Sequence, residues 1–484
     1  MDGTENDRSL PLSKKVIWWF AIAAGSAALF AQATLSTIRG VVADPSGAVL
    51  PGAEVTLVDQ STSVTARTLQ SAADGSFEVP DLRSGTYRLT VSLKGFKRYV
   101  ADDLRLEAGQ IRRDQDYDQD GWLDLFVVRY VAWDPAQEPP CTVGKSRVYC
   151  HPRYYEGLPN ALYRNNRDGT FTDVSLPSGI AGHRGKGMSV AFLDFDADGR
   201  LDALVANDTV PNFLFRNEGQ GRFREVGLSA GIAFNDDGRA LSSMGADARD
   251  IDNDGREDIF ITANHNETFP LFRNLGRGLF ADITCPSRVG RHTMAYTGWG
   301  NGIFDFDNNG RKDLFAARGS IDANLEEFSH RKAKQTVQVL VNRGDGRFDD
   351  LPLTTRPAMH RGAAFADFDG DGRVDAVVSR AGETPLVLRN TSSTRNHWLA
   401  LRLRGRRCNR DGIGAMIRVT GASGAEQWNR VTTAVGYASS SDRAVHFGMG
   451  ADGSARTIEI QWPSGSRQTL RDVACDRYLA VDEP

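Results

Sequence analysis

The chain has 484 residues, 40% of them apolar and 25% charged, and its formal net charge at pH 7 is −4. The length allows about three domains, and the composition is ordinary for a globular protein. A charge so close to neutral gives no reason to expect nucleic acid as a partner.

The N-terminus has the pattern of an export signal. Lys14 and Lys15 precede the apolar run 16–30, and the small residues of Ala-Gln-Ala follow at 31–33. Such an apolar core is short for a membrane span and suits a secretory signal peptide. We expect residues 1–33 to be a signal peptide, with an uncleaved N-terminal anchor as the alternative. Either way, the chain is predicted to be exported across the inner membrane and to be periplasmic, at the outer surface or secreted.

Residues 35–110 are predicted to form a small β-sandwich. Turn signals separate short apolar strands, and Tyr87, Leu89, Val91 and Leu93 alternate with polar residues. A period of two is typical of a half-buried strand. The segment resembles the carboxypeptidase regulatory-like domain, a prealbumin-type sandwich that occurs as a module on secreted enzymes and outer-membrane receptors. That resemblance implies no catalytic residue.

Residues 111–392 contain an internal repeat that predicts a β-propeller, so the expected fold class is all-β. An acidic loop, DYDQDGWLD in its first copy, occurs five times, and a hairpin motif of the form RNxGxG alternates with it. Four short strands per repeat is the unit of a propeller blade, and the strand count gives about 4.5 blades. The segment before the first loop lacks the small-residue strand that precedes the other four. The sandwich is therefore predicted to interrupt a blade.

Each acidic loop places oxygen ligands at positions 1, 3, 5 and 9 and a glycine at position 6. Carboxylates so close together repel one another unless a cation lies among them, and hard oxygen ligands around a sharp turn suit Ca²⁺. We predict up to five structural Ca²⁺ ions, whose binding is coupled to folding. The predicted ligands are Asp116, Asp118, Asp120, Asp124, Asp194, Asp196, Asp198, Asp202, Asp250, Asp252, Asp254, Asp258, Asp305, Asp307, Asn309, Asp313, Asp367, Asp369, Asp371 and Asp375.

An Asp-rich loop of this kind has two other interpretations. An EF-hand needs a glutamate at position 12 and helices on both sides, but position 12 is apolar in all five copies, so each loop is predicted to join two strands. Solvated Asp-Gly turns are the second alternative, and fivefold recurrence of one pattern disfavours them. Asn309 removes a charge from the fourth loop, which is predicted to bind most weakly. No histidine or free carboxylate is placed to activate a water, so the metal is predicted to be structural.

Residues 393–484 break the repeat and predict a further β domain without helices. The motifs NHWLALRLRG, CNRDGIGAMIRV, SSSDRAVHFGMG and IEIQWPSG follow in order and resemble the ASPIC/UnbV domain. The acidic loops resemble FG-GAP/VCBS repeats, the calcium-loop blades of integrin-α-type propellers. Together they resemble the bacterial cartilage acidic protein-like family, which implies an exported calcium-loop protein with adhesive or binding roles and no established reaction.

The five cysteines divide into one predicted disulfide, one candidate pair and one single residue. Cys141 and Cys150 lie close together in an insert and are predicted to bridge in an oxidising compartment. Cys408 and Cys475 are the further candidate pair, which leaves Cys285. The insert at 141–160 is rich in Tyr and Arg and is a candidate ligand contact, although a disulfide-pinned structural lid is the favoured interpretation.

The sequence favours a non-enzymatic binding or adhesion protein whose ligand is an extracellular glycan or protein, with outer-membrane or cell-surface association as a further expectation. The alternative is a secreted polysaccharide-active enzyme that uses an Asp/Glu pair on the propeller face. No HExxH, GxSxG, P-loop or Rossmann pattern is present, so no catalytic residue or organic cofactor site is predicted. Packing or hydrogen-bonding roles are expected for His183, His265, His292, His360 and His446.

Overall fold

The computed structural model describes residues 36–42, 49–82, 85–96, 98–106, 111–351, 353 and 355–484. The predicted signal peptide, residues 1–33, lies outside the described residues. The described chain is almost entirely β-structure, and its α-helices are single turns, α1 (Gly227–Ala230) and α2 (Val289–Thr293). None of the helices within these ranges is long and apolar enough to cross a membrane.

Two small antiparallel sheets around one core make up the N-terminal part. β1 (Ser36–Val41) pairs with β4 (Ser76–Leu82), and the second sheet has the order β3-β2-β5-β6. Tyr87 and Leu89 of β5 are buried against Leu57 of β2, as the alternating pattern predicts. The strands of the second sheet are β2 (Glu54–Asp59), β3 (Thr65–Gln70), β5 (Gly85–Ser92) and β6 (Tyr99–Leu106).

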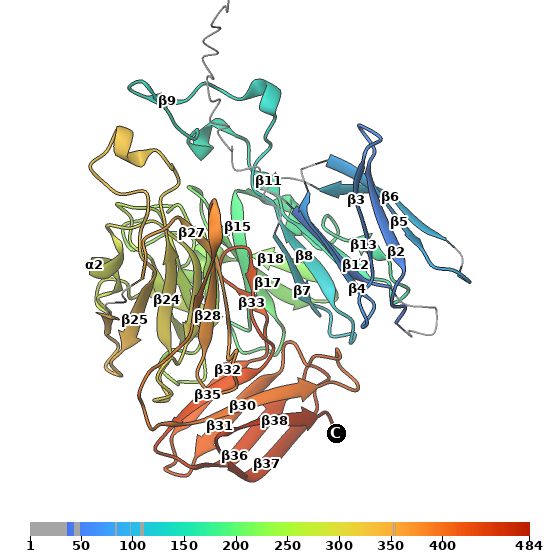
Figure 1. Cartoon of the computed structure of the whole chain (residues 1–484). Helices are drawn as coiled ribbons and strands as arrows, with labels where there is room; N and C mark the ends of the chain where they lie inside the picture. The colour runs from blue at the N-terminus through green and yellow to red at the C-terminus, as the bar shows by residue number, and fades with distance from the viewer. Residues whose placement is uncertain are drawn as a thin grey trace, which may run out of the picture.

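Five antiparallel sheets follow, and they are the blades of a propeller (Figure 1). The first strands of neighbouring sheets lie against one another, which places them at the inner edge of each blade. In chain order the blades are β7 (Ile111–Gln115), β8 (Asp124–Val128), β12 (Ala161–Asn165) and β13 (Phe171–Asp173); β15 (Gly187–Leu193), β16 (Asp202–Asn207), β17 (Phe213–Gly219) and β18 (Arg222–Glu225); β19 (Ala246–Arg249), β20 (Asp258–Ile261), β21 (Leu271–Gly276) and β22 (Leu279–Asp282); β23 (Gly298–Phe304), β24 (Asp313–Arg318), β25 (Gln338–Asn342) and β26 (Phe348–Leu351); and β27 (His360–Ala366), β28 (Asp375–Arg380) and β29 (Glu383–Leu388).

The prediction that the sandwich interrupts a blade is wrong. β7 pairs with β8 along its whole length, from Ile111 with Val128 to Gln115 with Asp124, so the first blade has four strands. Its sequence, IRRDQ, lacks the small residues of the other inner strands, but the hydrogen bonds of a ladder join backbones and do not require them. The last blade has three strands among the described residues.

Apolar side chains fill the spaces between neighbouring blades. Leu204 and Ile259 belong to the cluster between the second and third blades, whereas Phe260 and Leu314 belong to the one between the third and fourth. Successive residues of a strand point to opposite faces, so Ile259 and Phe260 contribute to two different cores. This explains why most of the described side chains in the inner and second strands are buried, instead of alternating between buried and exposed.

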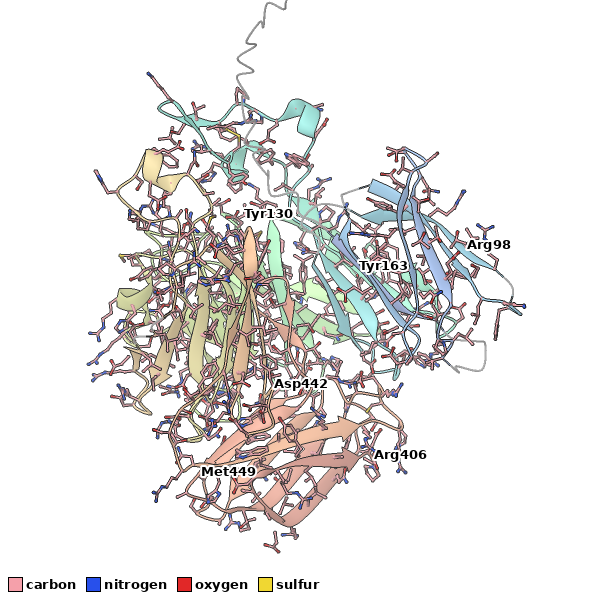
Figure 2. The ribbon with its side chains drawn as sticks, in the orientation of Figure 1. Arg98, Tyr130, Tyr163, Arg406, Asp442 and Met449 are labelled. Carbon is pink, nitrogen blue, oxygen red and sulfur yellow. A yellow bond between two sulfur atoms is a disulfide. The ribbon has the colours of Figure 1, made fainter. Side chains whose placement is uncertain are left out.

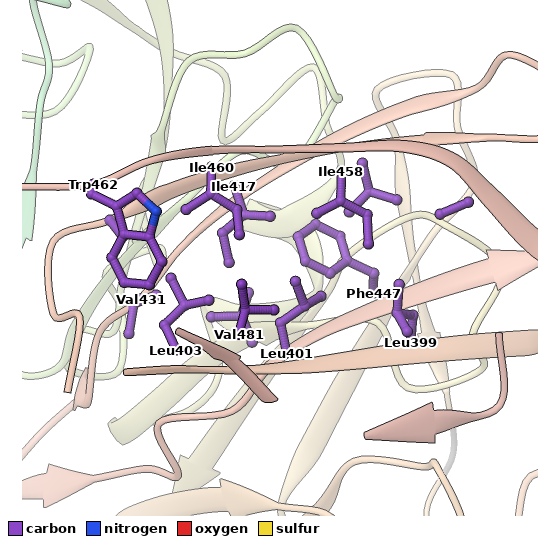
Figure 3. Packing of buried hydrophobic residues seen from close by; sticks show 14 of the residues in the cluster. Leu399, Leu401, Leu403, Ile417, Val431, Phe447, Ile458, Ile460, Trp462 and Val481 are labelled. Carbon is purple, nitrogen blue, oxygen red and sulfur yellow. The ribbon is translucent and has the colours of Figure 1, made fainter. Parts of the chain in front are cut away.

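The C-terminal part is a domain of two packed sheets, and none of its described residues is helical, as expected. One sheet has the order β35-β30-β38, in which β30 and β38 are parallel, and the other has the order β32-β31-β36-β37. Leu401, Ile417, Ile458 and Trp462 pack in the core between them (Figure 3). The strands are β30 (His397–Arg404), β31 (Met416–Gly421), β32 (Glu426–Arg430), β35 (Val445–Gly450), β36 (Ser454–Gln461), β37 (Arg467–Ala474) and β38 (Arg477–Asp482).

A short hairpin of the C-terminal domain extends into the propeller. β33 (Ala434–Val435) and β34 (Ser439–Ser440) pair with each other. β33 contacts the inner strands β15, β19 and β23, and β34 contacts β27. We call residues 432–442 the axial hairpin, because it lies along the inner edges of four blades.

The penultimate residue closes the C-terminal domain through a buried carboxylate. Glu483 is 1% exposed, and its Oε2 accepts hydrogen bonds from the amides of Arg406 and Arg407 at 2.7 Å and of Cys408 at 3.1 Å. Burial alone would raise the pKa of Glu483, but the hydrogen bond from Ser464 and those amides outweigh it and lower the pKa to about 2.

Replacing Glu483 by Gln is expected to destabilise the protein at pH 7 by about 1–3 kcal/mol, because backbone donors lose a charged acceptor. The folded-state pKa lies below the unfolded value of about 4.3, so the contribution is complete above about pH 5 and is lost as the pH falls toward 2. Urea unfolding of both proteins between pH 7 and pH 2 measures this. The stability difference should shrink across the acid window, and a constant difference would contradict the assignment.

Candidate metal centres

All five acidic loops lie at one end of the propeller, the end that faces the C-terminal domain (Figure 1). Each loop joins the first strand of its blade to the second, as β15 to β16 and β27 to β28. The prediction that the loops connect two strands is therefore confirmed. Since the blades share one orientation, the loops form an arc of similar sites.

In every loop three carboxylates converge, with oxygens within 4.8 Å of one another. Positions 1, 3 and 9 converge in the first, second and fourth loops, and positions 1, 3 and 5 in the third and fifth. The groups are Asp116, Asp118 and Asp124; Asp194, Asp196 and Asp202; Asp250, Asp252 and Asp254; Asp305, Asp307 and Asp313; and Asp367, Asp369 and Asp371. The predicted ligands Asp120, Asp198, Asp258 and Asp375 lie outside these groups. Asn309 accepts a hydrogen bond from the Arg311 amide at 2.8 Å.

The position-1 aspartate shapes the turn. In the second loop, Asp194 accepts hydrogen bonds from the amides of Asp198 at 3.0 Å and Gly199 at 2.9 Å. Gly199 has a φ of +85°, a left-handed conformation that favours glycine. The same bond from the position-6 amide is present in all five loops.

The position-9 aspartate has a structural role besides any metal ligation. Asp202 accepts hydrogen bonds from the amide of Phe195 at 3.2 Å and from the amide of Asn217 at 2.7 Å. It therefore joins the start of the loop to the third strand of the blade. The equivalent bonds are made by Asp124, Asp258, Asp313 and Asp375.

Burial makes the first four loops unfavourable places for negative charge. It raises the pKa of Asp116 and Asp194 to about 6, of Asp124 to about 7 and of Asp202 to about 8. Burial is also the largest cause of the raised pKa of Asp250, Asp258, Asp305 and Asp313, and neighbouring carboxylates add to it. A divalent cation would offset both the burial and the repulsion.

The donor set and its surroundings fit such a cation. In the second loop, Nε of Arg216 lies 2.8 Å from Oδ2 of Asp196. The other oxygen of Asp196, Oδ1, is buried and has no hydrogen-bond partner. Arg273 pairs in the same way with Asp252 at 2.6 Å, and Arg389 with Asp369 at 2.5 Å. An arginine thus pairs with one oxygen of the position-3 aspartate in three loops, and in the second loop the other oxygen of that aspartate remains available as a ligand.

The asparagine of the RNxGxG motif is a functional residue that the sequence reasoning missed. Nδ2 of Asn217 donates to the carbonyls of Tyr117 in the first acidic loop, at 2.9 Å, and of Leu201 in its own, at 3.2 Å. Asn274, Asn342 and Asn390 make the same two bonds. Each asparagine therefore links its loop to the loop of the preceding blade. Its recurrence beside every hairpin was the available signal.

Replacing Asn217 by Ala is expected to cost about 2 kcal/mol, because two buried carbonyls lose their donor. Asn165 is the matched control, since its Nδ2 donates to one carbonyl, that of Leu123, within its own blade. Asn165→Ala should cost less. Urea denaturation of the two variants provides the measurement, and an equal loss of stability would show that the link between blades contributes nothing.

The insert and a neighbouring loop cover the opposite end of the propeller. The disulfide between Cys141 and Cys150 is present, as predicted (Figure 2). Under the insert, Tyr130 donates to Oδ2 of Asp208 at 2.5 Å, and Lys186 donates to the Pro152 carbonyl at 2.7 Å. Burial raises the pKa of Asp208 to about 6. This buried polar group was not predicted, because its members come from separate blades.

Cys285 is free and exposed, whereas Cys408, Cys475 and three of the histidines have structural surroundings. The candidate disulfide between Cys408 and Cys475 is wrong, because both thiols are free and buried in the apolar core of the C-terminal domain. His360 Nδ1 bonds the Arg318 carbonyl at 2.8 Å, and His446 Nε2 bonds the Gly372 carbonyl at 3.0 Å. His183 packs on Phe213 and Phe215.

Three family models match the chain. The carboxypeptidase regulatory-like domain matches residues 37–116, the FG-GAP-like repeat matches 116–205, 194–261, 250–316 and 305–378, and the ASPIC and UnbV model matches 405–484. The FG-GAP-like matches together cover more than half of the chain.

Curated relatives include cartilage acidic protein 1 of Mus musculus, 30% identical over 335 residues that cover 64% of this chain and 47% of the relative. The Homo sapiens protein of the same name is 29% identical over 328 residues, which cover 64% and 46% of the two chains. The chain thus spans about half the length of the curated relatives it matches.

Among solved structures, the chain is similar to an Agrocybe aegerita lectin that recognises terminal N-acetylglucosamine, with a TM-score of 0.34, 16% identity and coverage of 70% of this chain and 90% of that one. A rhamnogalacturonan lyase of Bacillus licheniformis gives a TM-score of 0.28 at 13% identity, over 93% and 88% of the two chains. At these TM-scores the likenesses carry no argument about ligand or activity.

Proposed function

The chain belongs to the FG-GAP-repeat proteins and carries a C-terminal ASPIC and UnbV domain, and we propose that it is an exported, calcium-dependent binding protein without catalytic activity. Its ligand would be an extracellular glycan or protein.

The acidic loops support the calcium part of this proposal. Five times, three carboxylates converge within 4.8 Å in a turn between strands, and their donors are the hard oxygens that Ca²⁺ prefers. When bound, the ion would supply positive charge that holds the loop closed. The chain's own residues position the ligands: backbone amides orient the aspartates, and in three loops an arginine pairs with the position-3 aspartate.

The insert supports the binding part, and it carries the observation that favours this function most. Three aromatic side chains on or next to this disulfide-pinned segment remain exposed: Trp133 by 49%, Tyr149 by 45% and Tyr154 by 57%. Arg153 lies over the Tyr154 ring at 5.2 Å. Exposed aromatic groups held on a fixed loop beside a cation are typical of recognition surfaces.

A binding screen against arrays of glycans and extracellular proteins in calcium tests this function. The double variant Trp133→Ala and Tyr154→Ala should weaken any binding at least tenfold, or about 1.4 kcal/mol. Phe171→Ala is the control, because Phe171 is an aromatic residue of similar exposure, 41%, that lies outside the insert. Binding that survives the double variant would contradict the assignment of the insert.

The enzyme alternative is tested by a reducing-end release assay on a panel of polysaccharides. The carboxylate to replace is Asp208, because it lies buried under the insert with a raised pKa and a Tyr130 hydrogen bond. No release is expected from wild type. Release that Asp208→Asn abolishes would overturn the proposal of a non-enzymatic protein.

A further inference from the structure

The C-terminal domain is docked directly on the acidic loops. Tyr478 donates to Oδ2 of Asp367, the position-1 residue of the fifth loop, at 2.8 Å. Lys312, at position 8 of the fourth loop, is 4% exposed and donates to the Trp428 carbonyl at 3.1 Å. An added Cβ at Gly448 would lie 2.0 Å from an Asp305 oxygen. The geometry of the loops therefore defines the surface on which this domain rests.

The axial hairpin carries this contact into the centre of the propeller. The amide of Gly436 donates to the Ala246 carbonyl of β19 at 3.0 Å, and the amide of Phe365 in β27 donates to Ser441 Oγ at 3.0 Å. A Cβ at Gly436 would lie 2.5 Å from the Asn301 amide nitrogen of β23. The hairpin thus fits closely against three inner strands and cannot shift without disturbing them.

The tip of the hairpin reaches the residues below the insert. The Tyr437 ring lies 5.1 Å from that of Trp299, and the Arg361 guanidinium lies over the same Trp299 ring at 4.1 Å. Nη2 of Arg361 donates to the Ser320 carbonyl at 2.9 Å. Ser320 begins the loop that stands beside the insert.

That loop is bonded to the insert by two hydrogen bonds. The Tyr149 amide donates to Oδ1 of Asp322 at 3.1 Å, and Nδ2 of Asn324 donates to the Arg147 carbonyl at 3.0 Å. Contacts therefore run without a gap from the acidic loops, through the C-terminal domain and its hairpin, to the exposed aromatic residues at the other end.

We propose that divalent-ion occupancy of the acidic loops is transmitted through the axial hairpin and fixes the insert in its binding conformation. This inference rests on the proposed function, because it takes the loops as the metal sites and the insert as the ligand surface. Without the ion the carboxylates repel, the docking surface loosens, and the hairpin tip no longer holds Trp299 and Arg361. A coupling free energy then links ion binding in the acidic loops to the conformational order of the insert at the other end of the propeller.

Hydrogen–deuterium exchange of the full chain, with Ca²⁺ and with a chelator, tests the coupling. In wild type, Ca²⁺ should slow exchange in the acidic loops, in the hairpin and at 147–150, by about tenfold at the insert, within the usual range of coupling between sites. In Tyr437→Ala the acidic loops should still respond to Ca²⁺ and the insert should not. Ala438→Ser is the control, because Ala438 is an exposed neighbour on the same turn.

A second variant covers the case in which Tyr437→Ala fails to fold. Asn324→Ala removes a surface hydrogen bond to the insert and should reduce the response at 147–150 while the hairpin still responds. If Ca²⁺ slows exchange in the acidic loops of the wild type but not in the insert, the proposed transmission to the insert is overturned, whereas the proposed metal binding is supported. If no region responds to Ca²⁺, both the proposed metal binding and this inference are overturned.

Discussion

Removal of divalent ions is expected to lower the melting temperature of the protein by about 10 °C, and added Ca²⁺ is expected to restore it. Each loop holds three converging carboxylates, several of them buried with raised pKa values. An ion that binds only the folded loop stabilises it by about 2.7 kcal/mol when present at a hundred times its dissociation constant. Two filled sites would add about 5 kcal/mol, which at about 2 °C per kcal/mol for a chain of this size corresponds to the expected change in melting temperature.

Differential scanning fluorimetry in excess chelator and after Ca²⁺ addition measures this effect. Asp194→Asn should reduce the gain from Ca²⁺, because it removes one charge from a cluster. Asp345→Asn is the matched control, since Asp345 is a hairpin aspartate that pairs with Arg347 outside every cluster. Melting that is identical in chelator and in Ca²⁺ would show that the loops hold no stabilising ion.

The second large effect is expected at the interface between the propeller and the C-terminal domain. Arg430 of β32 forms a bidentate pair with Glu257 at 2.8 and 2.9 Å, and both side chains are buried. Glu257 also accepts the Asp194 amide at 3.0 Å. Arg430→Met should destabilise the protein by about 3–5 kcal/mol, because it leaves a buried carboxylate without its partner.

A double variant distinguishes the cost of leaving the Glu257 carboxylate buried without a partner from the cost of losing the packing of Arg430. Arg430→Met combined with Glu257→Gln removes both charges and should recover a large part of the stability lost in the single variant. Chemical denaturation of the wild type, the single variants and the double variant closes the cycle. If the double variant is less stable than Arg430→Met alone, the unpaired Glu257 carboxylate is not the cause of the lost stability.

The blades and their acidic loops could be predicted because they repeat. One copy of DYDQDGWLD is ambiguous, but five copies between strand-like runs specify both the fold and the convergence of the aspartates. The dual role of position 9 could not be predicted, because one of the two amides that bond Asp202, that of Asn217, comes from the third strand of the blade. The first inner strand was missed because its polar residues pair through their backbones.

The docking of the C-terminal domain depends on contacts that have no local pattern. Glu257 and Arg430 are 173 residues apart in the chain; Glu257 lies in the third acidic loop at a position that was not predicted to bind metal, and Arg430 belongs to no motif. One signal was nevertheless present. Position 8 of the loop is Leu123, Leu201 and Val374 in three copies but Glu257 and Lys312 in the other two. The charges at this otherwise apolar position mark two of the loops on which the C-terminal domain rests.

The disulfides show how far spacing alone can be used. Cys141 and Cys150 are nine residues apart in one small loop, and they bridge. Cys408 and Cys475 share a domain, but each is a buried thiol in its core. Sharing a domain does not bring two Cβ atoms to bonding distance.

The number of calcium ions bound per chain tests the central claim most directly. Native mass spectrometry of the purified full chain, after chelation and exchange into calcium, should show up to five bound ions, and Asp194→Ala should bind one fewer. A chain that binds no calcium under these conditions would contradict the account.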